Sequence, residues 1–414
     1  MLKLKRLRVE RFRSLAKGAE LSFADGINIV LGQNGTGKTT LLELISMVVR
    51  SDFSSLAKEE FAIEYELAGP GEESTIIILR NERISTEQIQ TPIELGPSEA
   101  FRPSAELLSS PDRKPLLHYR GGQRREVAVD DKSVIDVPER FPLPLEPGFL
   151  LSFAVVGLDS PRWEHLVRNL IETGRARRLD ESLDLFRTII GTGNFPGEIR
   201  ISKQGWSLST FAPSLVPDSI IQRLKDAYLP GRPDYSLTHL DLGLLATLKD
   251  MLGFSAAELR IDVTEQAQPA AVQIGNLVFR FKWEDGTFIT HERLSYGQKR
   301  LLTFFYYLAC NPAVVIADEL VNGLHHRWIT ASIEALGQRQ AFLTSQNPLL
   351  LDYIPITSAD EVRRSFVLCR GEPREGRPGW IWENMSEEDA RELYSAYEVG
   401  VEHVSEILQS RGLW

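Results

Sequence analysis

A glycine-rich stretch near the N-terminus carries the residue types that bind phosphate. Residues 32–39 read Gly-Gln-Asn-Gly-Thr-Gly-Lys-Thr, which fits the spacing G-x-x-x-x-G-K-[ST]. Glycines at this spacing let successive backbone N–H groups turn toward one anion, and a helix that begins here adds the positive end of its dipole. Lys38 would reach the β- and γ-phosphates of a nucleotide, and Thr39 would bind Mg²⁺. The expected nucleotide contacts are Asn34, Gly35, Gly37, Lys38, Thr39 and Thr40.

A second group of residues is a pair of acids after an apolar run. Residues 313–317 read Ala-Val-Val-Ile-Ala, and Asp318 and Glu319 follow. A buried strand of this composition would place both carboxylates at its C-terminal edge, where α/β sheets hold ligands. Asp318 would support Mg²⁺, directly or through water, and Glu319 would accept a proton from an attacking water. Because an apolar strand followed by acids is common, this assignment depends on its pairing with the phosphate-binding stretch.

The segment Leu294-Ser295-Tyr296-Gly297-Gln298 precedes a strongly apolar helical stretch. Alone, it is typical of a capped helix start. It also resembles the LSGGQ signature of ABC-type ATPases, with Tyr at the third position. The order of phosphate-binding stretch, signature and acidic strand is that of an ABC-type ATPase. Together the three motifs predict an α/β fold, that of an ABC-type P-loop ATPase head, with Lys38 and Glu319 as catalytic residues.

Three further segments narrow the resemblance: Phe12-Arg13-Ser14, Asn322-Gly323-Leu324-His325, and residues 343–352. The chain resembles the RecF, Rad50 and OLD group, and most of all its small prokaryotic AAA-domain ATPases, which are found with anti-phage defence systems. The resemblance implies ATP and Mg²⁺ as ligands and a homodimer that holds ATP between two heads. In that dimer Ser295 contacts the γ-phosphate on the partner, and Asn322 faces the partner. The implied nucleotide contacts are Arg13, Ser295, Gly297, Gln298 and Asn322.

Two positions depart from the group's pattern. The group commonly has Thr-His-Ser-Pro where this chain reads Ser345-Gln346-Asn347-Pro348, so Gln346 takes the place of the histidine that senses the γ-phosphate. Glutamine can donate a hydrogen bond but cannot carry the imidazolium charge, so we expect slow, switch-like hydrolysis. The metal-contacting glutamine of the Q-loop has no secure counterpart, and Gln123 is the candidate.

The elements needed to position these residues follow from the hydrophobic pattern. Short strands are expected at 4–9, 20–23, 27–31, 259–263, 277–283, 287–290, 313–317 and 341–344, and helices at 39–49, 160–174, 181–190, 219–228, 240–252, 296–309 and 328–336. The strand-helix alternation predicts an α/β sheet. A mainly helical insertion is expected between the phosphate-binding stretch and the signature. The expected parts are residues 1–147 and 259–385 for the ATPase head, 148–258 for the insertion and 386–414 for a helical tail.

Composition limits the remaining classes of protein. The 414 residues carry a formal charge of −10, which excludes a chain-wide attraction to nucleic acid. Two cysteines cannot build a disulfide framework. The N-terminus lacks the apolar run of a signal peptide, and no apolar stretch reaches the roughly 20 residues of a membrane helix. We therefore expect a cytoplasmic protein without a membrane span.

Two functions remain open. The first is a dimeric ATP-dependent switch that controls a separate effector protein, such as a nuclease, in anti-phage defence. The second is a RecF-like repair or recombination ATPase that binds DNA through local basic patches. The residues for such patches are Lys3, Lys5, Arg6, Arg8, Arg11, Arg120, Arg124, Arg125, Arg175, Arg177 and Arg178. A solvated basic face is the alternative for them. A transporter subunit is disfavoured by the long segment between the first two motifs, and the absence of heptads argues against Rad50-like arms.

Overall fold

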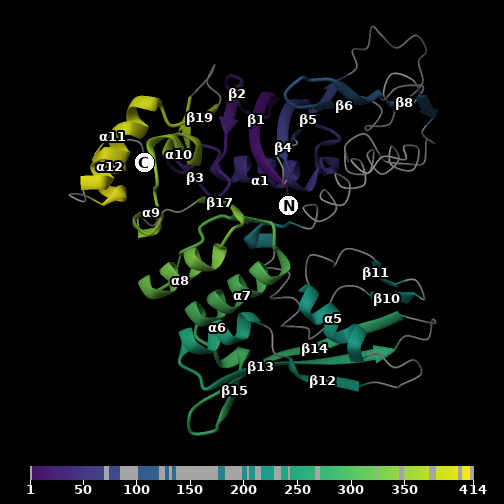
Figure 1. Ribbon diagram of the computed structural model, residues 1–414, viewed down its shortest axis with the longest axis vertical. Coiled ribbons are helices and arrows are strands. Elements are labelled where there is room, and N and C mark those ends of the chain that lie inside the picture. The colour runs from purple at the N-terminus through teal and green to yellow at the C-terminus, as the bar shows by residue number, and fades with distance from the viewer. Residues whose placement is uncertain are drawn as a thin grey trace. The chain divides into compact units, whose positions relative to one another are not determined.

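The computed structural model describes residues 2–69, 74–83, 101–120, 126–129, 133–136, 176–181, 198–202, 205–209, 216–227, 235–240, 243–265, 271–322, 324–344, 349–372, 379–399 and 403–410. Figure 1 shows the course of the chain. The chain divides into two compact units by its internal contacts. The first unit contains Met1–Ala176 and Gln338–Trp414, and the second contains Arg177–Gly337. The expected boundaries at residues 147, 258 and 385 stay predictions.

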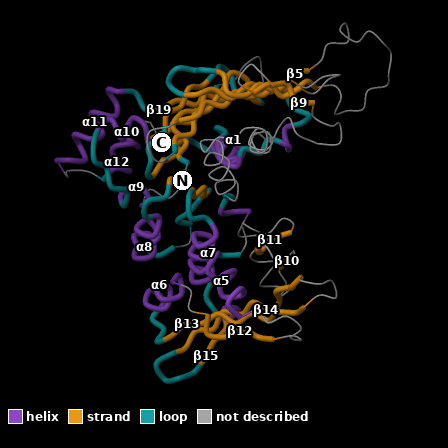
Figure 2. Tube along the Cα trace, turned by 45° about the vertical axis from the view of Figure 1, so that its right-hand side comes forward, coloured by secondary structure: helices purple, strands orange, loops and turns teal. Residues whose placement is uncertain are grey.

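The first unit contains an antiparallel sheet of eight strands, in the order β2-β1-β4-β5-β6-β7-β8-β9. The strands are β1 (Lys3–Phe12), β2 (Ala19–Ser22), β4 (Phe61–Ala68), β5 (Ser74–Arg83), β6 (Phe101–Ser109), β7 (Pro115–Arg120), β8 (Glu126–Val129) and β9 (Ser133–Asp136). Leu7 and Val9 of β1 are buried, whereas Arg8 and Glu10 between and beyond them are exposed. This period of two is the pattern of a strand with one covered face. Figure 2 shows the sheet nearly edge-on, with helix α1 on one side of it.

The second sheet of this unit carries the strand that leads into the phosphate-binding stretch. Strand β3 (Ile27–Leu31) lies between β17 (Gln340–Thr344) and β18 (Phe366–Gly371) and is parallel to both. Strand β19 (Trp380–Asn384) pairs antiparallel with β18. Helix α1 (Lys38–Arg50) follows β3, a short 3-10 turn (Ser54–Leu56) follows α1, and α10 (Ala359–Ser365) packs on the sheet. The predicted strand, loop and helix are therefore confirmed.

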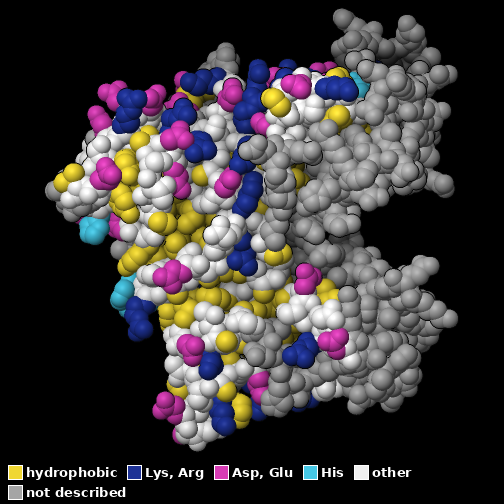
Figure 3. Space-filling model, viewed as in Figure 1, with side chains coloured by type: hydrophobic (Ala, Val, Ile, Leu, Met, Phe, Trp, Pro, Cys, Tyr) yellow, Lys and Arg dark blue, Asp and Glu magenta, His cyan; other side chains and the backbone are white. Residues whose placement is uncertain are grey.

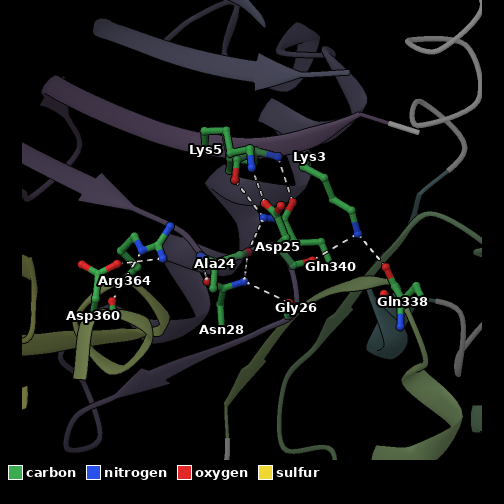
Figure 4. Close-up of polar contacts among 11 residues, drawn as sticks. Lys3, Lys5, Ala24, Asp25, Gly26, Asn28, Gln338, Gln340, Asp360 and Arg364 are labelled. Atoms are coloured by element: carbon green, nitrogen blue, oxygen red, sulfur yellow. Dashed lines mark hydrogen bonds and ion pairs between the residues drawn. The ribbon is translucent and has the colours of Figure 1, made fainter. Parts of the chain in front are cut away.

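Two buried amide side chains, those of Gln340 and Asn28, hold the strands around β3 in place (Figure 4). Gln340 accepts a hydrogen bond from Leu4 N at 2.8 Å and donates to the carbonyl oxygens of Leu4 and Ala24, each at 2.8 Å. Asn28 accepts from Ala24 N at 2.8 Å and donates to Ala341 O at 3.3 Å. Both side chains have no exposed area, so leaving one of these amides unpaired would be costly. Gln340 therefore fixes β17 against β1, and Asn28 fixes β3 to β17 and to the turn before β3.

The C-terminal helices are part of the core of the first unit. Helix α12 (Val404–Ser410) packs on α9 (Leu349–Asp352) and on α11 (Glu387–Val399). The apolar side chains of Leu393, Val404 and Leu408 are buried. The Ser405 hydroxyl also donates to the Asp352 carboxylate at 3.2 Å. These three apolar side chains of the tail therefore belong to the core, and the predicted helices of the tail are confirmed.

The second unit has its own antiparallel sheet, in the order β11-β10-β14-β13-β12, with β15 beside β14. The strands of the second unit are β10 (Glu198–Ser202), β11 (Gly205–Ser209), β12 (Tyr235–Leu240), β13 (Ala256–Glu265), β14 (Ala271–Lys282), β15 (Phe288–Thr290) and, outside this antiparallel sheet, β16 (Val314–Ala317). Its helices are α5 (Asp218–Ala227), α6 (Gly243–Leu252), the 3-10 turn His291–Arg293, α7 (Tyr296–Cys310) and α8 (His326–Leu336). The predicted hairpin turn at Asp285-Gly286 joins β14 to β15.

The expected helical insertion differs from the observed elements. Helices α5 and α6 lie where they were predicted, but β10, β11 and β12 are strands within residues 148–258. Ile199 and Ile201 alternate with polar residues, which is a strand period in a segment too short for a confident helix or strand assignment. Strands β4 to β9 were also missed. The predicted helix at 160–174 lies outside the described residues, as does all of the predicted helix at 181–190 except its first residue.

Four of the five basic side chains of β1 are paired with acids, and the fifth, that of Lys3, donates to backbone carbonyl oxygens. Arg6 contacts Glu20 at 3.2 Å and Glu64 at 2.6 Å, and Arg11 lies 3.9 Å from Glu60. On the face shown in Figure 3, blue and magenta side chains are interspersed over this part of the molecule. Paired cations release less counterion on binding a polyanion, so these residues are a weak nucleic-acid surface. Of the other basic residues considered, Arg178 contacts Asp180 at 2.6 Å, whereas Arg124, Arg125 and Arg175 lie outside the described residues.

No helix among the described residues is long and apolar enough to cross a membrane.

We predict that Glu64→Gln lowers the free energy of unfolding by about 1–2 kcal/mol, because hydrogen bonds to charged groups are strong and two arginines lose their anion. The Glu64 carboxylate accepts from Arg113 at 2.9 Å and from Arg6, and the Arg113 bond lowers the pKa of Glu64 below its ordinary 4.5. The stabilisation is therefore present above pH 4.5 and is lost as pH falls through the lower folded pKa.

Urea unfolding of the wild type and the variant at pH 7 and below pH 4 measures this difference. Glu10→Gln is the matched control, since Glu10 is exposed and its carboxylate lies 3.5 Å from Arg8. An equal effect of both substitutions, or a difference independent of pH, would contradict the prediction.

Candidate nucleotide-binding site

The phosphate-binding stretch forms a backbone cradle between β3 and α1. Gly32 and Gly37 have φ angles of 147° and 86°, which side chains rarely adopt. A Cβ atom on Gly32 would lie 2.2 Å from the Cys369 carbonyl oxygen, so β18 approaches this turn too closely for any side chain. Helix α1 begins at Lys38 with no acid in its first turn. The arrangement therefore presents backbone N–H groups and a helix N-terminus to an anion.

Lys38 is held inside the cradle. Its ammonium donates to the carbonyl oxygens of Gly32 at 2.7 Å and Gln33 at 3.0 Å. The side chain is 9% exposed. Burial raises the pKa of the nearby Cys369 thiol to about 12, so the group that flanks the cradle is neutral. The lysine charge is therefore held by carbonyl oxygens, which phosphate oxygens can replace.

Arg13 lies on the turn after β1 and is held by two carboxylates. It donates through Nε to Glu59 at 3.0 Å and through Nη1 to Glu43 of α1 at 2.9 Å. The φ angle of Arg13 is 41°, which lies in the left-handed region. The hydrogen bond to Glu59 is the main cause of the raised pKa of Arg13. The guanidinium is thus engaged by Glu43 and Glu59, and the predicted contact of Arg13 with nucleotide stays a prediction.

The acidic pair follows the buried strand β16, as predicted. All four residues of β16 are buried, and Asp318 and Glu319 are half-buried at its end. Glu319 has a φ of 53°, which is strained for a side chain with a Cβ atom. Its carbonyl oxygen accepts from Arg300 Nη2 at 2.5 Å, and its Oε2 accepts from Asn322 Nδ2 at 2.9 Å. Glu319 is therefore held by the signature helix and by the turn that follows it.

Strand β16 is itself anchored to α7. Tyr307 accepts from Ile316 N at 2.9 Å and donates to Arg177 O at 2.7 Å. Asn311 accepts from Arg177 N at 3.0 Å. These bonds join the apolar helix, the acidic strand and the segment at residues 177–178 within the second unit.

The signature segment forms the N-terminus of α7. Ser295 accepts from Gln298 N at 3.4 Å, and Gln298 Oε1 accepts from Ser295 N at 2.8 Å, which is a complete capping box. Accepting this bond leaves the Ser295 hydroxyl hydrogen able to donate to a phosphate. Tyr296 is 66% exposed, and Gly297 lies in the same first turn. Both interpretations of the segment, helix cap and phosphate contact, are compatible with this geometry.

The structure brings the predicted residues together in two groups. Asn34, Gly35, Gly37, Lys38, Thr39 and Thr40 lie in the first unit with Arg13, and Ser295, Gly297, Gln298, Asp318, Glu319 and Asn322 lie in the second. Gln346 and Gln123 lie outside the described residues. Arg300 was missed by sequence reasoning, because a basic residue within a helix has no local pattern that marks its partner.

The donor set fits a nucleotide and a magnesium ion. Backbone N–H groups and an ammonium group bind phosphate oxygens, and a threonine hydroxyl with an aspartate carboxylate supplies the hard oxygen ligands that Mg²⁺ prefers. Among the described residues no group of three or more His, Cys, Asp or Glu side chains could hold a metal without a nucleotide. Thr39 of the first unit and Asp318 of the second stay predicted Mg²⁺ ligands.

Comparison with protein families decides the assignment. Residues 27–352 match the family described as "AAA domain, putative AbiEii toxin, Type IV TA system". The chain belongs to this family. The match contains the cradle, the signature and the acidic strand in one domain, so the predicted α/β ABC-type P-loop ATPase head is confirmed. Members of this family bind ATP and Mg²⁺ in general through the P-loop, as the cradle of this chain is built to do.

Individual relatives match more narrowly. The DNA replication and repair proteins RecF of Shewanella loihica and Shewanella piezotolerans are each 48% identical over 44 residues, which cover 11% of this chain and 12% of the relative. The chain thus spans about one eighth of the length of these curated relatives.

Two solved structures cover most of the chain at low similarity. The SMC head domain from Thermotoga maritima has 12% identity and a TM-score of 0.35, covering 93% of this chain and 99% of its own. The recombination mediator RecF with a bound ATP analogue has 13% identity and a TM-score of 0.37, covering 92% and 98%. The assignment to the family rests on the sequence match alone.

We predict that Gly32→Ala abolishes nucleotide binding and lowers the free energy of unfolding by about 2 kcal/mol or more, because the added methyl group would overlap the Cys369 carbonyl and the φ of 147° disfavours alanine. Gly26→Ala is the matched control, because a Cβ there meets nothing within 4 Å. Thermal unfolding and ATP binding of both variants check the prediction. A folded Gly32→Ala protein that binds ATP as the wild type does would refute it.

Proposed function

We propose that this protein is an ATP-hydrolysing molecular switch that dimerises around ATP and controls a separate effector in anti-phage defence. One observation carries the hydrolysis part: the backbone cradle and Lys38 belong to the same family domain as a glutamate held in a strained conformation at the end of a buried acidic strand. Strain of this kind is concentrated at functional sites.

The chemistry follows from these residues. Water attacks the γ-phosphorus of ATP, the bond to the β,γ-bridging oxygen breaks, and the products are ADP and phosphate. Glu319 accepts the proton of the attacking water. Lys38 neutralises charge on the β- and γ-phosphates, and Thr39 and Asp318 hold Mg²⁺, directly or through water. Bound Mg²⁺ supplies charge neutralisation at the phosphate oxygens.

Two features support slow hydrolysis. The Oε2 atom of Glu319 accepts a hydrogen bond from Asn322, so the general base is engaged before any partner chain is present. Gln346 stands where the group commonly has histidine, and its amide cannot supply a positive charge to the γ-phosphate. Both are consistent with a switch that holds ATP longer than it cleaves it.

The exposure of the signature segment supports the dimer. Tyr296 is 66% exposed, and Ser295 and Asn322 are also exposed. These residues are available to a second copy of the chain, whose P-loop would bring the nucleotide. The homodimer would therefore bury an exposed aromatic side chain as well as ATP.

The effector part rests on the family description, which names an AbiEii toxin and a type IV toxin–antitoxin system. We infer that the partner of this ATPase is a separate protein, with a nuclease as the first candidate. The second candidate function, a DNA repair ATPase, is favoured by the RecF similarity over 44 residues. The carboxylate pairing of the β1 cations weighs against it.

We predict that Glu319→Gln lowers ATP turnover by at least about a hundredfold, because the general base is lost, while ATP binding is retained. Lys38→Ala should abolish binding. The wild-type turnover should lie below roughly 10 s⁻¹. Phosphate release and equilibrium binding measure these values, with exposed Glu334→Gln as the control. Turnover of the Glu319→Gln protein close to that of the wild type would rule out the assigned base.

We also predict that Glu319→Gln forms a dimer with ATP and that adding Tyr296→Ala prevents it, because the signature turn would face the partner's nucleotide. Light scattering with and without ATP measures the mass. Affinity purification of the tagged Glu319→Gln protein then tests the effector: a stoichiometric protein partner supports the switch, whereas recovery of DNA and DNA-stimulated turnover would support the repair function. A monomer under all conditions would exclude the ATP-held dimer.

A further inference from the structure

The backbone of Trp380 attaches β19 to the turn that carries Arg13. Trp380 N donates to Ser14 O at 3.0 Å, and Ala16 N donates to Trp380 O at 2.8 Å. Leu15 and Trp380 form a parallel bridge. Since β19 pairs with β18, this turn is fixed to the same sheet as the phosphate-binding strand.

The side chain of Trp380 lies on the phosphate-binding cradle. Its indole Nε1 donates to Gly35 O at 3.1 Å. Its ring covers Gly37 so closely that a Cβ atom there would lie 2.8 Å from the ring atom Cδ2. Gly35 and Gly37 both have positive φ angles, of 81° and 86°. The indole therefore contacts the two glycines whose left-handed conformations give the cradle its shape.

The indole is itself held by the core. It stacks on Trp382 with ring centroids 6.2 Å apart and an interplanar angle of 9°. Trp382 is buried and lies 6.2 Å from the ring of Phe12, the residue before Arg13. Packing against Trp382 thus fixes the position of the Trp380 ring on the phosphate-binding cradle.

Trp380 and Trp382 differ in the hydrogen bonding of their indole Nε1 atoms. The Nε1 of buried Trp382 has no hydrogen-bond partner among the described residues, so this side chain acts there through its packing. The half-buried Trp380 directs its Nε1 to a carbonyl of the cradle. This difference points to a role for Trp380 in the shape of the nucleotide site and not only in packing.

We propose that Trp380 is a positioning residue that holds the phosphate-binding cradle in its binding conformation and joins it to the Arg13 turn. The proposal rests on the proposed nucleotide site. Glycines lose much conformational entropy when fixed, and a cradle fixed in advance does not pay that cost when nucleotide binds. Trp380 therefore raises the affinity for nucleotide without touching the reacting atoms.

The test compares Trp380→Phe, which keeps a ring over Gly37 and removes the N–H donor, with Trp380→Ala. The probe is ATP carrying an N-methylanthraniloyl group, and the readout is its Kd. Loss of one hydrogen bond of ordinary strength predicts about fivefold weaker binding for Trp380→Phe, and loss of the ring predicts a larger effect for Trp380→Ala. Trp283→Phe is the matched control, because Trp283 is 39% exposed and lies in the other unit.

Hydrogen exchange of nucleotide-free protein separates this proposal from the proposed function. The backbone amides at residues 35–38 should exchange faster in Trp380→Phe than in the wild type, while those of β1 remain unchanged. A variant with a lower melting temperature but unchanged Kd and unchanged exchange at residues 35–38 would overturn the proposal, since Trp380 would then be a packing residue. If wild type fails to bind ATP, the proposed function falls, and the exchange rates still decide whether Trp380 fixes the cradle.

Discussion

The position of β3 between two parallel strands from the last quarter of the chain is the constraint on which the nucleotide site depends. Strand β17 pairs with it on one side and β18 on the other. At the end of β3, the Cys369 carbonyl lies so close to Gly32 that only glycine fits. The cradle is therefore completed by residues more than 300 positions away, and it cannot take its final shape until the C-terminal strands are in place.

Buried amides make this arrangement specific. Gln340 hydrogen-bonds like a strand neighbour to Leu4, and Asn28 joins the turn before β3 to β17. An apolar side chain at either position would leave backbone groups without partners in a region closed to water. Such bonds add little net stability each, but they exclude other registers of the two sheets. Strand β3, which leads into the cradle, is therefore held in a single register.

At the end of the acidic strand β16, by contrast, a strained backbone conformation lowers local stability and positions a residue for chemistry. Glu319 has a left-handed φ, and the cost is offset by the Arg300 bond to its carbonyl and the Asn322 bond to its carboxylate. Helix α7, which contains Arg300, begins in the Ser295 capping box and holds β16 through a hydrogen bond to Tyr307. One helix thus sets the place of the signature and of the glutamate.

The local patterns of the sequence by themselves determined the strand, cradle and helix at residues 27–50, the capped helix start at residues 294–298, the buried acidic strand and the tail helices. Each of these depends on neighbours within about one or two turns or on a simple period. Strands β4 to β9 and the hairpin β10–β11 were not predicted, because short alternating runs of residues are ambiguous without the strands with which they pair. Gln346 and Gln123 stay predictions. Only the tertiary structure decided that Trp380 lies on Gly37, that the Cys369 carbonyl lies against Gly32, and that Glu64 pairs with Arg6 of β1. These contacts join residues far apart in the chain, and no local spacing encodes which distant backbone will approach.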